Sequence, residues 1–410
     1  MKPIHHGGLA LSAALAAALV AGCSSSTDPA DAAPNNAAPT VAPAVEVTSP
    51  EPRLALTYDG GILVVDATEL DVVANLPLDG FNRLGPAGDD RHVFVSTTGG
   101  FRALDTGSWS DAHGDHSHHF AGTPALTDLT FPADKPGHVV AHAGTTALFD
   151  DGTGNIALFD SDELDPSGPR PDTDTYTTPD AHHGVAVPLE DGSLLVTEGD
   201  SESRSSVVLL DVDRNEVART DECAGVHGEA VAADSVVFGC EDGMVIFRDG
   251  TFTKVTAPDP YGRLGNQAGS EESPIVLGDY KTDPDAELER PERVALVDTR
   301  SAQMQLVDLG TSYTFRSLGR GPHGEALVLG TDGALHVIDP ETGDVVERIT
   351  VLDPWTEPDE WQSPRPALTV EGHTAYVTDP ANDELHAVDL ESGGIRTATL
   401  PHTPNEISTS

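Results

Sequence analysis

Three histidines share one sequence context, in which a glycine and then strand-forming residues follow the imidazole. They are His183 in Ala-His-His-Gly-Val-Ala-Val, His227 in Gly-Val-His-Gly-Glu-Ala-Val and His323 in Gly-Pro-His-Gly-Glu-Ala-Leu. The first two are 44 positions apart and the last two are 96 apart, which is twice 48. Such spacing places them at equivalent positions of a repeat. Three neutral imidazoles that converge would bind Zn²⁺, Cu²⁺ or Ni²⁺ and leave one coordination position open.

A second group of histidines lies in a segment rich in Gly, Ser and Asp, which predicts a loop between two repeats. Short His-rich tracts bind metal, although the signal is only compositional and a solvated polar loop has the same composition. This loop would cover the first site as a lid, or capture metal and pass it inward. Its candidate ligands are His113, Asp115, His116, His118 and His119.

Several further residues are weaker candidates. His182 adjoins His183, and His402 begins the C-terminal segment. Glu229 and Glu325 each lie two residues after a repeated histidine, on the same side of a strand, as ligands or as acceptors that orient an imidazole. The remaining histidines of the mature chain are expected to be surface or packing residues. They include His138, His142, His336, His373 and His386.

The elements around these histidines are short strands. Asp-Gly turns followed by alternating apolar residues recur at Asp59, Asp191 and Asp332, and such units return about every 35 to 60 residues. This pattern predicts an all-β fold, a β-propeller of eight blades, or of seven if one unit has been split. One of the predicted units spans Leu126–Leu164, and the C-terminal segment His402–Ser408 would complete the first blade and close the ring. First strands line a propeller's channel, so the repeated histidines would converge on the axis.

The chain begins with features of an export signal. Lys2 precedes a short apolar run, Leu9–Ala21, which ends in Val-Ala-Gly-Cys23 and resembles a bacterial lipobox. We therefore predict a signal peptide over 1–22, lipidation of Cys23, a flexible tether over 23–52 and a single propeller domain over 53–410. No later apolar stretch is long enough for a membrane helix.

Charge and cysteine content restrict the partners and the compartment. The sequence has 68 acidic and 22 basic residues, a formal charge of −46, which disfavours binding to nucleic acid. Lipidation would use Cys23 and leave Cys223 and Cys240. An even remainder in an oxidising compartment predicts one disulfide.

The repeated His-Gly context, the His/Asp loop and the Cys223/Cys240 pair resemble the AztD family of zinc metallochaperones. The resemblance covers most of the chain after Pro52. It implies an extracytoplasmic propeller that binds Zn²⁺ through histidines and delivers it to the solute-binding protein of an ABC zinc importer. It also implies ligand exchange instead of catalysis. Because zinc binds neutral imidazole, retention is expected to weaken as the pH falls from about 7.5 to about 5.5.

Two other interpretations remain open at the level of sequence. One is a metal-dependent propeller hydrolase or lactonase, with Glu229 or Glu325 as general base, although the sequence contains no G-x-S-x-G or H-E-x-x-H motif. The other is a non-catalytic interaction scaffold of the cell envelope, in which the histidines are incidental.

Overall fold

The computed structural model describes residues 44–410, and the predictions for the signal peptide and for Cys23 lie outside the described residues. Within them, the chain already forms a strand at β1 (Val45–Val47), which pairs with β9 (His116–Ala121). The predicted flexible tether therefore does not extend to residue 52. No helix among the described residues is long and apolar enough to cross a membrane.

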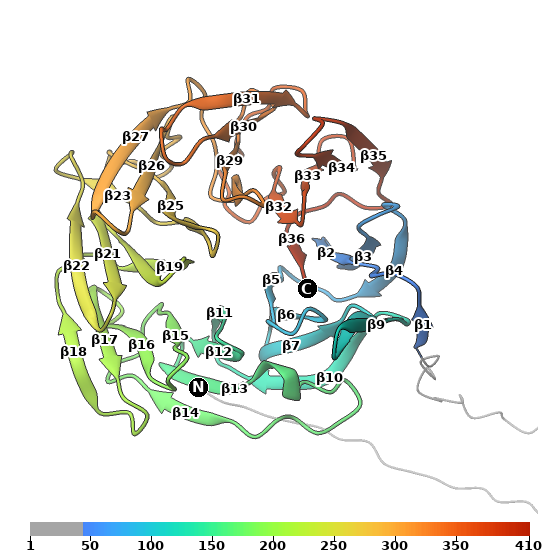
Figure 1. The fold of residues 1–410 in the computed structure, drawn as a ribbon, viewed down its shortest axis with the longest axis horizontal. Coiled ribbons are helices and arrows are strands. Elements are labelled where there is room, and N and C mark those ends of the chain that lie inside the picture. The colour runs from blue at the N-terminus through green and yellow to red at the C-terminus, as the bar shows by residue number, and fades with distance from the viewer. Residues whose placement is uncertain (1–43) are drawn as a thin grey trace, which may run out of the picture. The chain divides into compact units, whose positions relative to one another are not determined.

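Eight antiparallel sheets of four main strands are arranged around a central axis (Figure 1). Within each blade the strands follow one another from the inner to the outer position. The first contains β36 (Ile407–Thr409), β2 (Arg53–Tyr58), β3 (Gly61–Asp66) and β4 (Val72–Pro77). The second contains β5 (Arg83–Pro86), β6 (His92–Thr97), β7 (Gly100–Asp105) and β10 (Ala125–Pro132). The third contains β11 (Pro136–His142), β12 (Thr145–Asp150), β13 (Asn155–Asp160) and β14 (Asp174–Thr177).

The fourth and fifth blades follow directly. The fourth contains β15 (Ala186–Pro188), β16 (Leu194–Gly199), β17 (Arg204–Leu210) and β18 (Glu216–Thr220). The fifth contains β19 (His227–Ala232), β20 (Ser235–Cys240), β21 (Asp242–Arg248) and β22 (Thr251–Thr256), with β23 (Gly262–Arg263) added beside β21.

Three blades complete the set. The sixth contains β24 (Gln267–Ser270), β25 (Ser273–Asp279), β26 (Arg293–Asp298) and β27 (Gln303–Asp308). The seventh contains β28 (Leu318–Arg320), β29 (Ala326–Leu329), β30 (Ala334–Ile338) and β31 (Val345–Thr350). The eighth contains β32 (Leu368–Glu371), β33 (Thr374–Asp379), β34 (Glu384–Asp389) and β35 (Ile395–Thr399). The predicted all-β propeller is confirmed, with eight blades.

The apolar core lies between neighbouring blades and not inside one sheet. Alternate residues of each strand face opposite sides, so each sheet presents apolar side chains to both of its neighbours. Eight buried clusters each join at least two successive blades. One of them packs Leu54 and Leu56 of the first blade against Leu385 and Ala387 of the eighth.

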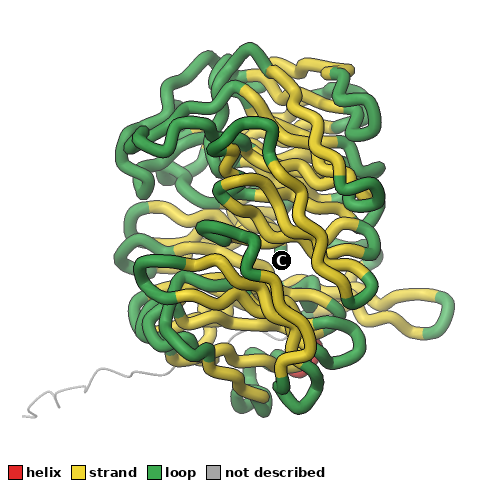
Figure 2. Tube along the Cα trace, turned by 90° about the vertical axis from the view of Figure 1, so that its left-hand side faces the viewer, coloured by secondary structure: helices red, strands yellow, loops and turns green. Residues whose placement is uncertain are grey.

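The C-terminal strand lies in the first blade, as predicted. β36 pairs antiparallel with β2, with Leu54 opposite Thr409 and Leu56 opposite Ile407. The strand starts at Ile407 and not at His402. Figure 2 shows that strands dominate the described chain, whose single helical element is a short 3-10 turn at Ser161–Glu163.

One insertion shifts the predicted boundaries of the blades. β8 (Ser108–His113) and β9 form a hairpin between the third and fourth strands of the second blade. The predicted unit starting at Leu126 is therefore wrong, because Leu126 belongs to β10, the outer strand of that blade. The His-rich segment is also not a loop between blades. It forms the tip of this inserted hairpin and the adjoining residues of both strands.

Candidate metal centre

Three histidines from three consecutive blades lie together at the inner strands. His138 lies on β11, His183 precedes β15 and His227 begins β19. The ring centroids are 4.7 Å apart for His138 and His183, 5.1 Å for His183 and His227, and 6.0 Å for His138 and His227. We call these residues the three-blade cluster. The first strands of neighbouring blades also contact one another, as β11 does β15, so the fold itself brings the three positions together.

Hydrogen bonds fix the same tautomer in all three rings. Nδ1 of His138 lies 2.9 Å from the carbonyl oxygen of Gly184, and Nδ1 of His227 lies 2.5 Å from that of Gly265. A carbonyl oxygen only accepts, so both Nδ1 atoms must donate a proton. Each Nε2 then carries a lone pair, which is the form of imidazole that binds a metal ion.

His183 has a charged acceptor in place of a carbonyl. Its Nδ1 lies 2.5 Å from Oδ2 of Asp151, a residue in the turn between β12 and β13. A carboxylate in this position orients the imidazole and raises its basicity as a ligand. The turn fits closely against its neighbour, since a Cβ on Gly137 would lie 2.1 Å from Oδ1 of Asp151. Glycine at position 137 therefore leaves room for this carboxylate.

The protein environment keeps two of the rings neutral. Burial lowers the pKa of His138 from its ordinary value of 6.5 to about 3, and the neighbouring His183 and His227 add to the effect. Burial also lowers the pKa of His227 to about 3, although its hydrogen bond to Gly265 acts in the opposite direction. Neutral rings without competing protons are suited to metal binding.

The ligand atoms of the three-blade cluster lie further apart than they would around a bound metal ion. Among the described residues, two other groups of ligands have their atoms within 4.8 Å of one another, and this cluster does not reach that limit. Small movements of the rings would have to bring the Nε2 atoms to about 2.0–2.1 Å from a common ion. Metal binding would therefore bring the three imidazole rings closer together.

His138 was missed by the sequence interpretation, which assigned it to packing or the surface. A signal was present, because His138 precedes His183 by 45 positions, nearly the 44 that separate His183 from His227. Its context, Gly-His-Val, lacks the glycine after the imidazole that identified the others. The spacing of the repeat therefore identifies His138 as a candidate, whereas the His-Gly motif does not.

His323 does not join the three-blade cluster, contrary to the prediction. The inner strand of its blade is β28, which ends at Arg320, so His323 lies in the turn after that strand and not at its start. Its ring contacts that of His373, in the corresponding turn of the eighth blade, with centroids 5.6 Å apart. Glu325 accepts a hydrogen bond from the backbone N–H of His323, at 3.0 Å.

The weaker candidates have other contacts. Both ring nitrogens of His182 are engaged, by the carbonyl of Asp180 at 3.0 Å and the hydroxyl of Thr197 at 3.2 Å. His402 stacks on Tyr58, with centroids 4.0 Å apart. Burial raises the pKa of Glu229 to about 7. A bulge separates Glu229 from His227 at Gly228, so the two do not simply share one side of the strand.

The inserted hairpin carries a second cluster of ligands. His113, His116 and His118 offer ligand atoms within 4.8 Å of one another, and we call them the hairpin cluster. Nε2 of His116 lies 3.3 Å from Nε2 of His118, while Nδ1 of His118 lies 2.6 Å from Oε1 of Glu46 on β1. His113 and His116 are exposed.

The remaining two predicted residues of this segment lie beside the hairpin cluster. Asp115 is at the tip, with Oδ1 3.2 Å from Nδ1 of His116. His119 faces Ser110, with 2.7 Å between its Nδ1 and the hydroxyl oxygen. The hairpin therefore presents a compact set of imidazoles to solvent.

A disulfide stabilises the segment that leads into His227. Cys223 and Cys240 are bonded, with Cα atoms 4.9 Å apart, so the predicted disulfide is confirmed. Cys240 ends β20, and the N–H of Glu241 donates to the carbonyl of Ala224 at 2.7 Å. The crosslink therefore attaches the start of one inner strand to the next strand of the same blade.

Comparisons with known proteins agree with this architecture. No protein-family model matches the chain. In sequence, the chain is 26% identical over 341 residues to a curated protein of Citrobacter koseri named zinc chaperone AztD, covering 80% of this chain and 78% of that protein. That protein is named as a chaperone and not as an enzyme.

Solved structures show the same fold. A crystal structure of Citrobacter koseri AztD superposes with a TM-score of 0.77 at 23% identity, covering 88% of this chain and 98% of that one. Apo AztD from the same species gives 0.75 over the same shares. The dihydro-heme d1 dehydrogenase NirN gives 0.54 at 13% identity, over 88% and 76%, and is alike in fold alone. The resemblance of this chain to the AztD family is therefore confirmed, in sequence by the curated relative and in fold by the solved structures.

Proposed function

We propose that this protein is a zinc metallochaperone that holds Zn²⁺ between His138, His183 and His227. The observation that carries the proposal is the three-blade cluster itself, in which every Nδ1 faces an oxygen acceptor. This leaves three Nε2 lone pairs, one from each of three neighbouring blades, for one ion. His138 takes the place that the repeated motif had assigned to His323.

Three protein ligands suit a cargo that has to be released. Zn²⁺ in proteins is usually four-coordinate, so a three-histidine site keeps one position for water or for a ligand from another protein. Asp151 supplies negative charge beside the site through His183 and strengthens that ligand. A partner can then replace the protein ligands one at a time, without zinc ever becoming free in solution.

The hairpin cluster is a separate zinc-binding element in this proposal. Its imidazoles are accessible, and the hairpin is an insertion that the propeller core does not need. It would collect zinc or contact the receiving protein, while the more enclosed three-blade cluster retains the ion. Its ligands are His113, His116 and His118, with Asp115 and His119 beside them.

We further propose that the protein works outside the cytoplasm, attached to the membrane through lipidated Cys23. The Cys223–Cys240 disulfide fits an oxidising compartment. Anchoring would raise the effective concentration of the chaperone near a membrane transporter. The recipient would be the solute-binding protein of an ABC zinc importer. The excess of 46 negative charges disfavours nucleic acid as a partner.

The proposal is tested by counting zinc and following its transfer. The His138→Ala/His183→Ala/His227→Ala variant of the full chain should bind one zinc fewer than wild type by mass spectrometry after desalting. The matched control, His323→Ala/His373→Ala, removes two imidazoles elsewhere in the propeller and should keep the full content. Unchanged zinc in the triple variant, with circular dichroism like that of wild type, would refute the site.

The chaperone role needs a kinetic measurement as well. Zinc-loaded protein is mixed with a metal-free solute-binding protein of an ABC zinc importer, or with a small chelator of matched affinity. Transfer to the binding protein should be faster than transfer to the chelator and should increase with its concentration. Equal rates, limited by spontaneous release, would contradict direct transfer.

A further inference from the structure

A third group of metal-ligating side chains lies in the eighth blade, away from the three-blade and hairpin clusters. Asp379 ends β33, Glu384 starts β34, and His386 follows on the same strand. One ligand atom of each lies within 4.8 Å of the other two. We call these residues the eighth-blade cluster. All three come from one hairpin, so the local fold alone positions them.

The register of this hairpin places two carboxylates against each other. Asp379 pairs directly with Glu384, and Val377 pairs with His386. Like charges directly opposite on neighbouring strands are destabilising. Among residues 44–410, neither carboxylate forms an ion pair with a lysine or an arginine, and Glu384 is 3.6 Å from Nε2 of His386. The guanidinium of Arg365, which lines the same pocket as Asp379, forms an ion pair with the carboxylate of Glu357 at 2.8 Å.

His386 presents an unused nitrogen to these carboxylates. The residue is only 7% exposed, and Nδ1 lies 2.9 Å from the hydroxyl of Thr397 on β35. Nε2 is buried and has no hydrogen-bond partner within the described chain. A buried polar atom without a partner costs about 1–3 kcal/mol, so its retention here calls for an explanation.

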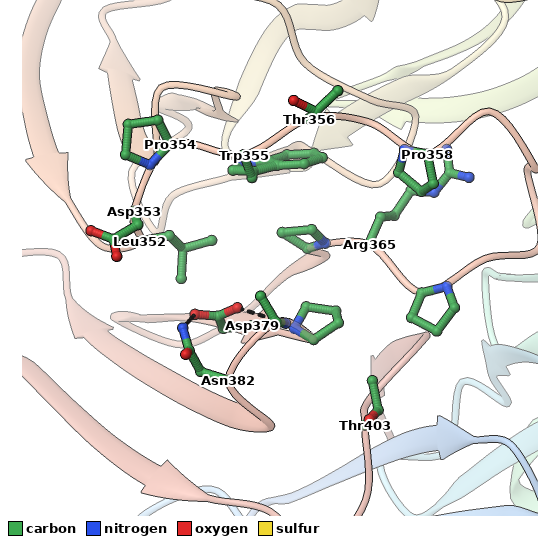
Figure 3. Close-up of a pocket in the computed structure, with 14 residues that line it drawn as sticks. Leu352, Asp353, Pro354, Trp355, Thr356, Pro358, Arg365, Asp379, Asn382 and Thr403 are labelled. Carbon is green, nitrogen blue, oxygen red and sulfur yellow. Dashed lines mark hydrogen bonds between the residues drawn. The ribbon is translucent and has the colours of Figure 1, made fainter.

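Asp379 is held in place by its own turn. One carboxylate oxygen accepts from the backbone N–H of Ala381 at 3.0 Å, and the other accepts from the amide of Asn382 at 2.8 Å. Each oxygen keeps a second lone pair for another partner. Figure 3 shows Asp379 and Asn382 on one side of a pocket whose opposite side carries Leu352 and Trp355. This pocket has a volume of about 470 Å³ and gives solvent a route to the carboxylate.

We propose that Asp379, Glu384 and His386 form a further site, structural in role, for a divalent transition-metal ion, with Zn²⁺ as the ion that the ligand set fits. A cation would neutralise the opposed carboxylates and give Nε2 of His386 its missing partner. One imidazole and two carboxylates suit Zn²⁺, whereas Ca²⁺ and Mg²⁺ prefer oxygen ligands alone. The fourth position would hold water from the pocket.

The site would stabilise the end of the propeller. Asp383 lies in the turn of the same hairpin. Its carbonyl oxygen accepts a hydrogen bond from the N–H of Leu400 at 2.7 Å, and its carboxylate accepts one from the hydroxyl of Thr403 at 2.5 Å. These residues lead into β36, the strand that lies in the first blade. An ion that rigidifies the hairpin would therefore also support the path of the C-terminal segment. This inference is independent of the proposed chaperone site.

The test uses the full chain with the other candidate sites removed. In a background without the histidines of the three-blade and hairpin clusters, ZnCl₂ is titrated against a chromophoric chelator. One zinc should remain bound, and Glu384→Gln/His386→Gln should abolish it. Glu347→Gln, an exposed carboxylate of the seventh blade, is the matched control and should leave it unchanged. No residual zinc in the background, while its circular dichroism matches wild type, would overturn the proposal.

A second measurement covers the case in which that background does not fold. In the otherwise unchanged chain, His386→Gln should lower bound zinc by one equivalent and remove part of the zinc-dependent rise in melting temperature. Unaltered zinc content would overturn the proposal. An unchanged content in the three-blade variant would instead count against the chaperone site, so the two failures are distinguishable. Retention of Ca²⁺ in place of Zn²⁺ would also contradict the assignment.

Discussion

The metal-free protein should lose stability on acidification because two half-buried histidines of the three-blade cluster resist protonation. His138 and His227 have a pKa of about 3 in the folded chain and an ordinary value of 6.5. The folded value is the lower one, so the unfolded chain takes up protons first. The contribution of these two histidines to the free energy of unfolding is fully present above pH 6.5. It is progressively lost as the pH falls toward 3.

The magnitude follows from the difference between the pH and the unfolded-state pKa. Each histidine should lower the free energy of unfolding by about 1.36 kcal/mol for every pH unit below 6.5. At pH 5.0 the loss is therefore about 2 kcal/mol for each histidine, relative to neutral pH. Two independent groups would give about 4 kcal/mol. The rings interact, so the expected loss is about 2–4 kcal/mol. Zinc should oppose it, by about 2.7 kcal/mol at a free concentration 100 times Kd.

The assay is urea unfolding of the metal-free chain at pH 7.5 and pH 5.0. The many carboxylates also respond to pH, so the His138→Gln/His227→Gln variant serves as the reference that retains them. Wild type should lose about 2–4 kcal/mol more than this variant between the two pH values. An equal loss in both proteins would show that His138 and His227 do not cause the pH dependence. The same pKa values predict that these two ligands stay neutral at pH 5.5, which revises the expectation of zinc loss in that range.

Four further predictions concern the site and its supports. Asp151→Asn should weaken zinc binding about 10- to 100-fold, because it removes the charge that polarises His183; competition with a chelator measures this, and an unchanged Kd would contradict it. Gly137→Ala should weaken binding without removing a ligand, since the new Cβ displaces the Asp151 carboxylate; wild-type affinity would argue against that packing. Replacing both Cys223 and Cys240 by serine should lower the free energy of unfolding by about 3 kcal/mol, whereas wild type in reductant should match the variant. Removing the hairpin cluster should slow transfer to the binding protein in stopped-flow mixing but leave the three-blade zinc in place, and loss of that zinc would show that the clusters form one site.

The fold was predictable because its signals are local and repeated. Asp-Gly turns and alternating apolar residues mark hairpins one at a time, and eight such units define the propeller without knowledge of any long-range contact. The disulfide was predictable by counting cysteines. The inserted hairpin was not predictable, because its polar sequence is typical of a loop, and only the pairing of β8 with β9 and of β9 with β1 shows that these residues form strands.

The metal site was predictable in kind but not in membership. His183 and His227 share both a motif and a place at the start of an inner strand, so sequence and structure agree on them. His323 shares the motif alone, because β28 is only Leu318–Arg320 and the His-Gly-Glu-Ala segment leads into the second strand of its blade. His138 shares the place alone. A motif reports local sequence, whereas convergence on an axis depends on register within the blade.

An anomalous difference map of crystals of the zinc-loaded protein, collected at the zinc absorption edge, would locate the bound ion. We expect a peak about 2.0–2.1 Å from Nε2 of His138, His183 and His227, with Asp151 still hydrogen-bonded to Nδ1 of His183. Zinc on the hairpin or in the eighth blade, with no peak between these three rings, would contradict this expectation.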